Sequence, residues 1–234
     1  MTRPSFRTAV LAVWGAALLL GATAQAAEAS NEPPDAAGGD TARPSPGEFY
    51  LSAGPGGVVF DAGASVKAAG ANLPGATVKV DSNATLIVSA GYRRGPFQIS
   101  FTGGYPPVTS IRGAGALAPL GVLGQARYGP AVLEGQYRLP AIGGFQPYIG
   151  GGPVFLIIFS DEDRAVRSLR IKNSTGVAIG TGFDYRLSRR WSAYFSTKKI
   201  FLSTSAYGSL GGAPISARIR LDPTLITSGL SYHF

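Results

Sequence analysis

The chain has 234 residues, with 33 glycines, 10 tyrosines, 12 phenylalanines and only 15% charged residues, which favours many glycine-punctuated strands over a helical bundle. It contains no cysteine, which excludes a disulfide framework, a thiolate nucleophile and a cysteine metal site. The net charge of +8 predicts contact with anions. Because the lysines and arginines are scattered, the phosphates of lipopolysaccharide fit this charge better than nucleic acid does.

The first 26 residues have the pattern of a cleaved export signal. Arg3 and Arg7 precede the apolar run 9–22, and 24–26 (Ala-Gln-Ala) is a small-x-small cleavage site. The run is shorter than the roughly 20 residues that a membrane-spanning helix needs. Residues 27–47 carry proline, glycine and acids without periodicity, which predicts a flexible periplasmic lead-in to a folded part at 48–234.

From Glu48 onwards, apolar and polar residues alternate in segment after segment, with the period of a β-strand. No stretch approaches 18 unbroken apolar residues, so we do not expect a helical membrane span in this part. The last segment ends on Tyr-His-Phe, and outer-membrane barrels commonly close on such a strand. The eight expected strands lie near residues 49–54, 85–92, 97–102, 132–139, 145–159, 177–187, 191–198 and 224–234.

The connections between these strands alternate in length. The short turns lie near 93–96, 140–144 and 188–190, and the long links near 60–83, 104–125, 160–174 and 204–219. This alternation predicts an all-β fold, an eight-stranded antiparallel up-and-down transmembrane β-barrel with periplasmic turns and external loops. A soluble lipocalin-like barrel is the competing architecture, and it would carry its charges outside. Here the charged strand residues lie opposite the aromatic face, and a lysine or arginine facing lipid would cost about 2–4 kcal/mol. We therefore expect them in the lumen.

Eight strands enclose a lumen that side chains nearly fill, so we do not expect an open aqueous pore. The alternation instead predicts an apolar cup that opens outwards above a polar floor near the periplasmic turns. The apolar lumen residues are Val154, Leu156, Ile158 and Leu225. The residues of the polar lumen floor are Glu134, Gln136, Arg138, Asp184, Arg186, Tyr194 and Lys198. In the alternative interpretation, the same residues are the packed core and polar plug of a non-conducting structural barrel.

Three further patterns bear on function. Gly129-Pro130 and residues 150–153 interrupt two strands, and they predict either bulges that could open the wall or ordinary bends. Adjacent acids at 161–163 do not have the ligand spacing of a calcium site. Basic residues of the long links would face lipopolysaccharide phosphates or solvent. These residues are Lys67, Lys79, Arg112, Arg164, Arg167, Arg170, Lys172, Arg218 and Arg220.

The single histidine, His233, lies at the chain end. A Ser-His-Asp arrangement would need it near a nucleophile and an oxyanion hole. Neither a Gly-x-Ser-x-Gly pattern nor a phosphate-binding loop stands out. We therefore predict no catalytic residue, no metal site and no cofactor, and we do not expect an enzyme.

Several segments resemble the OmpW family of small outer-membrane barrels over residues 48–234. They are 146–152 (Gln-Pro-Tyr-Ile-Gly-Gly-Gly), 182–185 (Gly-Phe-Asp-Tyr) with the downstream Trp191 and 198–200 (Lys-Lys-Ile), 221–223 (Leu-Asp-Pro) and 229–234 (Gly-Leu-Ser-Tyr-His-Phe). Gly104-Tyr105-Pro106-Pro107 matches a proline-bearing end of that family's third strand, whereas Lys199 stands where the family usually has an aromatic residue.

The resemblance implies a channel in the bacterial outer membrane for passive uptake of small hydrophobic molecules through a narrow apolar lumen, with lateral release into the bilayer. It also implies contact with outer-membrane lipid and lipopolysaccharide, and insertion by the barrel-assembly machinery. The alternative is a non-conducting structural or surface barrel whose loops contact lipopolysaccharide or host molecules.

Overall fold

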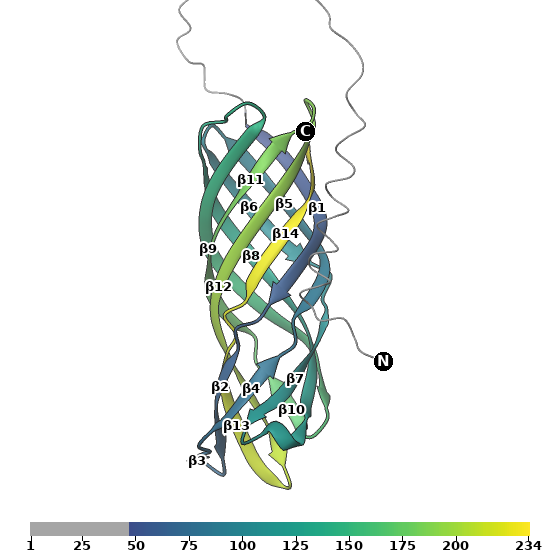
Figure 1. The fold of residues 1–234 in the computed structure, drawn as a ribbon, viewed down its shortest axis with the longest axis vertical. Coiled ribbons are helices and arrows are strands. Elements are labelled where there is room, and N and C mark those ends of the chain that lie inside the picture. The colour runs from purple at the N-terminus through teal and green to yellow at the C-terminus, as the bar shows by residue number, and fades with distance from the viewer. Residues whose placement is uncertain (1–46) are drawn as a thin grey trace, which may run out of the picture. The chain divides into compact units, whose positions relative to one another are not determined.

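In the computed structural model, which describes residues 47–234, eight long strands form a closed antiparallel barrel (Figure 1). They are β1 (Glu48–Val59), β5 (Asn83–Arg94), β6 (Phe97–Gly104), β8 (Val122–Arg138), β9 (Phe145–Asp163), β11 (Ser174–Arg186), β12 (Trp191–Leu210) and β14 (Thr224–His233). Each pairs with the next of these strands along the chain, and β14 pairs with β1 to close the barrel, with Leu230 opposite Ala53. The predicted fold class is confirmed. The predicted signal peptide 1–26 and nearly all of the predicted lead-in 27–47 lie outside the described residues.

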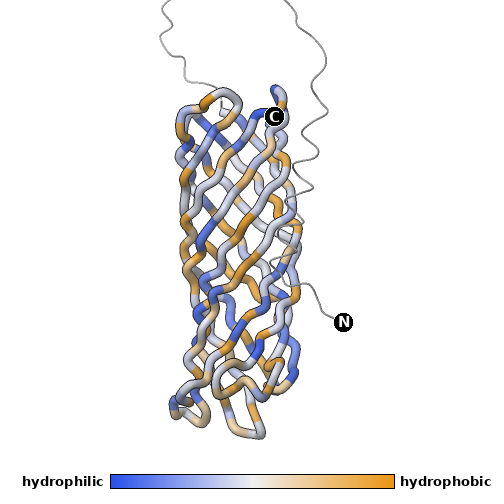
Figure 2. Tube along the Cα trace, viewed as in Figure 1, coloured by the Kyte–Doolittle hydropathy of each residue, from blue (hydrophilic) through white to orange (hydrophobic). Residues whose placement is uncertain are grey.

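Figure 2 shows hydrophobic and hydrophilic residues interspersed along the strands of the barrel. Exposed and buried residues alternate along these strands, because successive side chains of a strand point to opposite faces. Outward-facing apolar residues stay exposed, such as Phe97 at 66% and Ile179 at 59%. Their inward-facing neighbours are polar and buried, such as Gln98 and Ser100. This sidedness is that of a membrane barrel, because lipid rather than a protein core covers the apolar face.

Aromatic side chains gather at the end of the barrel that carries the short turns. Ring pairs join neighbouring strands there, with centroids 4.8–5.6 Å apart, in Phe49–Tyr92, Phe97–Tyr137, Phe145–Phe183 and Trp191–Tyr232. Aromatic girdles mark the interfaces of outer-membrane barrels, and short turns face the periplasm. We therefore assign this end to the periplasmic side.

At the opposite end the predicted long loops are largely strands, so the expectation of loops is wrong there. The additional strands are β2 (Gly63–Ala68), β3 (Ala71–Asn72), β4 (Ala76–Val80), β7 (Val108–Gly115), β10 (Arg167–Ile171) and β13 (Ala213–Arg220). Strand β7 pairs with the outer part of β8, and β10 and β13 pair with the outer part of β12, where both long strands run on past the barrel proper. Strands β2, β3 and β4 pair in turn with β13, β2 and β7. The result is an extension of two walls, one with strand order β10-β12-β13-β2-β3 and one with β4-β7-β8-β9 (Figure 1).

Helical structure is minor in residues 47–234. The one helical segment there is η1 (Ala118–Leu120), a single 3-10 turn. No helix in this part of the chain is long and apolar enough to cross a membrane.

Candidate functional site: the barrel lumen

A buried ion pair lies across the periplasmic half of the lumen. Glu134 of β8 is fully buried, and its Oε2 lies 3.2 Å from the Nζ of Lys198 on β12. Gln136 donates to the same carboxylate oxygen at 2.8 Å, and Lys198 donates to the Oγ of Ser196 at 3.0 Å. Because a charge in a low-dielectric lumen needs a partner of opposite charge, these two residues stabilise each other's charged state.

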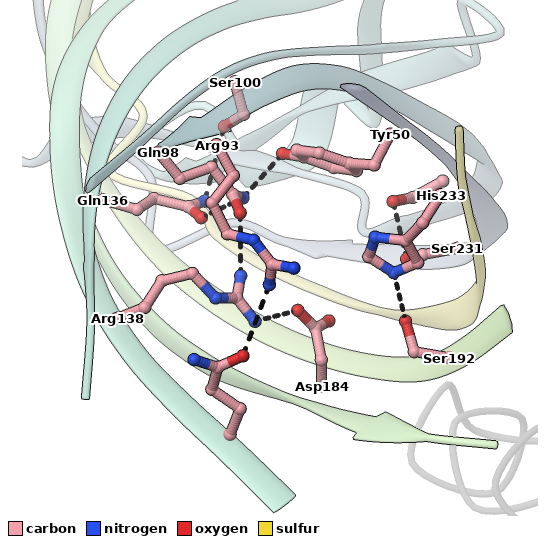
Figure 3. Close-up of polar contacts among 12 residues, drawn as sticks. Tyr50, Arg93, Gln98, Ser100, Gln136, Arg138, Asp184, Ser192, Ser231 and His233 are labelled. Atoms are coloured by element: carbon pink, nitrogen blue, oxygen red, sulfur yellow. Dashed lines mark hydrogen bonds and ion pairs between the residues drawn. The ribbon is translucent and has the colours of Figure 1, made fainter. Parts of the chain in front are cut away.

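A second ion pair extends this layer towards the periplasm (Figure 3). Arg138 pairs with Asp184 of β11 and donates to the Oε1 of Gln98 at 2.9 Å. Gln98 in turn donates to the Oη of Tyr50 on β1 at 2.8 Å and to Gln136 at 2.6 Å. The network therefore crosses the lumen from β1 to β11. The cavity that remains among these side chains has a volume of 30 Å³, room for about one water molecule.

Most of the predicted polar floor meets in this network. Glu134, Gln136, Arg138, Asp184 and Lys198 join it directly, and Tyr194 lines the same 30 Å³ cavity. Arg186 lies two residues beyond Asp184 at the end of β11, where it is exposed. The structure therefore does not bring Arg186 into the network. We call the six residues that meet there, together with Gln98 and Tyr50, the ionic plug.

An apolar layer follows the ionic plug on the outward side. On β8, Val132 comes between Glu134 and the outer half of the lumen, and on β12 Ile200 comes directly after Lys198 on the inward face. The predicted lumen residues Val154 and Leu225 belong to the same layer. We call this layer the apolar seal. Its members are 0–3% exposed, and they are Val58, Val132, Val154, Ile200 and Leu225.

Beyond the apolar seal lies a cavity of 40 Å³, here called the inner cavity. The predicted residues Leu156 and Ile158 line it. The rest of its wall comes from segments that the sequence placed in links or left unassigned. These residues are Phe60, Val80, Thr109, Ile111, Ala126, Tyr128, Ile171, Thr204, Ile219 and Leu221.

A second apolar cavity of 50 Å³, the outer cavity, lies inside the extension. Val66, Val78 and Val166 are among its lining residues. Ile111 and Ile219 line both cavities, so these two side chains lie between them. The outer cavity was not predicted from the sequence, although Val66 alternates with Ser65 and Lys67, and Ile219 with Arg218 and Arg220, as in strands with one buried face.

The wall of the barrel is interrupted beside the inner cavity. The ladder between β6 and β8 ends at Thr102 opposite Val132, and pairing with β8 resumes only at Val108 opposite Arg127. Residues 103–107 thus face residues 128–131 without a regular ladder, with one hydrogen bond from the Tyr128 N–H to the Pro107 carbonyl at 3.2 Å. Gly129-Pro130, predicted to weaken the strand, lies in this interruption.

His233 lies close to a serine, which sequence analysis did not anticipate. Its Nε2 is 2.7 Å from the Oγ of Ser192 (Figure 3). Its Nδ1 is 2.8 Å from the Oε1 of Glu48. Glu48 also pairs with Arg93. These contacts link a serine, a histidine and a glutamate, as in a catalytic triad. Ser192 is only 3% exposed, however, and it lies between its ladder partners Arg186 on β11 and Ser231 on β14. Ladder pairing engages the backbone N–H groups that an oxyanion hole would need. We therefore interpret Ser192, His233 and Glu48 as a clasp that ties β14 to β12 and β1.

Two carboxylates of the acidic cluster at 161–163 accept hydrogen bonds from backbone N–H groups. Asp163 accepts hydrogen bonds from the N–H groups of Ser168 at 2.7 Å and Leu169 at 2.9 Å, and Asp161 accepts one from Ile171 at 3.1 Å. The two N–H donors lower the pKa of Asp163, because they stabilise its carboxylate form. Within residues 47–234 no group of three or more His, Cys, Asp or Glu side chains is placed to hold a metal ion.

Three known proteins are similar to this chain. The chain is 33% identical over 178 residues to the dibenzothiophene metabolism operon protein PahQ of Pseudomonas aeruginosa. These residues make up 76% of this chain and 84% of PahQ. It is 30% identical over 166 residues to the outer membrane protein AlkL of Ectopseudomonas oleovorans, covering 70% and 72%.

Solved structures agree with these relatives. AlkL in lipid bilayers, determined by solid-state NMR, superposes with a TM-score of 0.65 at 27% identity, over 88% of this chain and 97% of AlkL. The crystal structure of OprG from Pseudomonas aeruginosa superposes with a TM-score of 0.75 at 24% identity, over 80% and 96%. The model of the OmpW family matches residues 45–234. Barrels of this family are not enzymes in general, and relatives carry the name outer membrane protein. The chain belongs to the OmpW family and is an outer-membrane β-barrel.

Proposed function

We propose that the chain lets small hydrophobic molecules pass the outer membrane through the apolar part of its lumen. The observation that carries this proposal is the pair of apolar cavities, of 50 and 40 Å³, in series along the extension and barrel mouth. An apolar solute gains about 25 cal/mol per Å² of surface that it removes from water. Both cavities are smaller than such a solute, so their apolar side chains would move apart to admit it, and they would then give it a favourable environment beyond the hydrophilic surface of the cell.

The relatives support a class of solute. PahQ and DoxH are named as proteins of a dibenzothiophene metabolism operon, and both are 33% identical to this chain. Dibenzothiophene is a flat, uncharged aromatic molecule, and no charged side chain is among the residues that line the two cavities. We assign to the chain neutral hydrocarbons and aromatic compounds of similar polarity.

The exit that we propose is sideways, through the interruption between β6 and β8. Below the inner cavity, the apolar seal and the ionic plug oppose further descent. At the interruption, the side chains of Phe159 and Pro106 both pack next to Gly129, where an added Cβ would lie 3.1 Å from the Phe159 ring and 3.8 Å from the Cγ of Pro106. A solute that separates these side chains would move from the inner cavity into hydrocarbon without meeting a charge.

Uptake by intact cells tests this proposal. Gram-negative cells that lack related barrels would be given the wild type, Leu156→Lys or the control Ser160→Lys, and the initial uptake of dibenzothiophene would be measured at equal surface expression. Leu156 lines the inner cavity, whereas Ser160 is exposed further along the same strand. We expect Leu156→Lys to abolish the uptake that depends on the protein, because a cation would lie in the apolar cavity, and Ser160→Lys to retain it. Wild-type cells that take up no more than cells without the protein would favour a non-conducting structural barrel.

A disulfide tests the lateral exit separately. The chain has no cysteine, and continuing the β6–β8 register places Gly103 opposite Ala131 within the interruption. A cysteine pair at these two positions should lower uptake, and a reductant should restore it. A control pair at Phe101 and Leu133, which are already ladder partners, should leave uptake unchanged. Unchanged uptake with the 103–131 bridge formed would exclude this exit.

A further inference from the structure

The outward face of the β10-β12-β13-β2 wall is rich in cations. On adjacent strands, Arg218 lies opposite Ser65 and Ser205, and the backbone of Lys172 bonds to that of Ser205. One row further out, Tyr207 lies between Arg170 on β10 and Ser216 on β13, and Ser216 is opposite Lys67 on β2. Neighbouring strands are about 4.8 Å apart, so these side chains share one surface about 15 Å wide.

These cations point away from the lumen. The residues between them on the same strands, Val66, Ala206 and Ile219, are buried in the interior of the extension. Period-two alternation therefore places the basic residues on the outer surface. We call this surface the basic wall. Its cations are all exposed, and they are Lys67, Arg170, Lys172, Arg218 and Arg220.

Little negative charge balances the basic wall. Asp222 forms an ion pair with Arg220 at 3.2 Å, and Asp61 is the other carboxylate on the segments of this wall. Within residues 47–234, no ion pair engages Lys67, Arg170 or Arg218, and Lys172 lies 5.2 Å from the ring centroid of Tyr207.

The opposite wall differs in charge. Its segments carry four acids, Asp81, Asp161, Glu162 and Asp163, which balance four bases, Lys79, Arg112, Arg127 and Arg164. Arg112 is paired with Asp81 at 3.0 Å. The excess of positive charge is therefore local to the basic wall and does not follow from the overall composition.

The basic wall begins where the apolar belt ends. On β12, Phe201 is 44% exposed and faces lipid, and the next outward residues are Ser203 and Ser205. Arg220 lies opposite Ser203 and Arg218 opposite Ser205. With about 3.3 Å per residue and a strand tilt near 40°, these two cations lie roughly 5–10 Å above Phe201. This is the depth of lipid headgroups, just outside the hydrocarbon.

We propose that the basic wall binds the phosphate groups of lipopolysaccharide in the outer leaflet. Guanidinium and ammonium groups, together with the serine hydroxyls between them, match phosphate oxygens in charge and hydrogen bonding. This interaction is independent of transport. It would fix the depth and rotation of the barrel in the leaflet, with the basic wall against lipid headgroups and the opposite wall without such contact.

The test measures binding of purified diphosphoryl lipid A to the folded barrel in detergent, with dephosphorylated lipid A as the second probe. The triple variant Lys67→Gln, Lys172→Gln, Arg218→Gln neutralises the basic wall. The control variant Lys79→Gln, Arg127→Gln, Arg164→Gln makes the same change in net charge elsewhere in the extension. Since each cation near such a surface contributes about 1 kcal/mol, we expect the first variant to bind about a hundredfold more weakly and the control to bind like the wild type.

Dephosphorylated lipid A should bind all three proteins equally weakly, and excess inorganic phosphate should not displace the diphosphoryl lipid. If both triple variants lose the same affinity for diphosphoryl lipid A, binding depends on net charge alone, and the proposal is overturned. Equal binding of the two lipids would overturn it as well, and displacement by inorganic phosphate would refute the assignment to a lipid. Heat-resistant electrophoretic mobility of the variants checks that each barrel is folded.

Discussion

The buried pair of Glu134 and Lys198 allows a sharp test of the ionic plug. In Lys198→Met, a side chain of similar length replaces the cation that lies 3.2 Å from the Glu134 carboxylate. The glutamate is 0% exposed and keeps Gln136 as a neutral donor at 2.8 Å. Removal of one partner of a buried ion pair costs about 3–5 kcal/mol, because the remaining charge has no counterion. We expect the free energy of unfolding to fall by this amount.

The double variant Glu134→Leu, Lys198→Met removes both charges and should recover most of that loss. Gln136 and Ser196 then each lose one hydrogen-bond partner, at a net cost of about 1 kcal/mol each. We therefore expect the double variant to lie within about 2 kcal/mol of the wild type and above Lys198→Met. Denaturant unfolding in lipid vesicles measures this, with the emission of Trp191, the only tryptophan outside the predicted signal peptide. If the losses of the single variants Lys198→Met and Glu134→Leu simply add in the double variant, the pair is not coupled and the assignment of an ion pair to the plug is wrong.

Two further predictions follow from local geometry. In Gly152→Ala the new Cβ would lie 2.1 Å from the Leu133 carbonyl oxygen. We expect the free energy of unfolding to fall by at least about 1–3 kcal/mol in the same assay. The control Gly57→Ala should change it little, because no atom lies within 4 Å of a Cβ at that position. Because the folded pKa of Asp163 is lowered, its anchoring of the segment 164–170 operates above the ordinary carboxyl pKa of 3.8 and weakens as the pH falls through the lowered value. The amide protection factors in that segment, corrected for the intrinsic pH dependence of exchange, should fall at acidic pH in the wild type, and they should already be low at neutral pH in Asp163→Asn. High protection factors in the variant would contradict this.

The barrel strands could be predicted from the sequence because contact with lipid constrains one face of each strand. A strand that faces hydrocarbon must keep one face apolar along its whole length, so Phe97, Ile99 and Phe101 identified both the strand and its outer face. The same rule placed Glu134 and Lys198 inside. Their pairing could not be predicted, because β8 and β12 are not neighbours in the barrel, and contact across the lumen depends on register and shear.

The extension was harder to predict, because lipid does not constrain it. Its strands β2, β4 and β13 are only five to eight residues long, so each of them offers few alternating positions. They form because the long strands β8 and β12 run on past the membrane and supply edges that are free for pairing. β13 pairs with β12 and β2 with β13, while β7 pairs with β8 and β4 with β7. The clasp of His233 with Ser192 and Glu48 was likewise invisible, since it joins the two ends of the folded chain.

The seal and the plug oppose different molecules, and together they account for a lumen that is closed in this structure. Hydrocarbon side chains such as Val154 and Leu225 can move aside for an apolar solute at the cost of rotamer changes, whereas water and ions gain nothing there. An apolar solute that passed the seal would then have to displace Glu134 and Lys198 from each other, which costs several kcal/mol. Under the proposed function, the cheaper route from the inner cavity is through the wall at residues 103–107, into a solvent that resembles the solute.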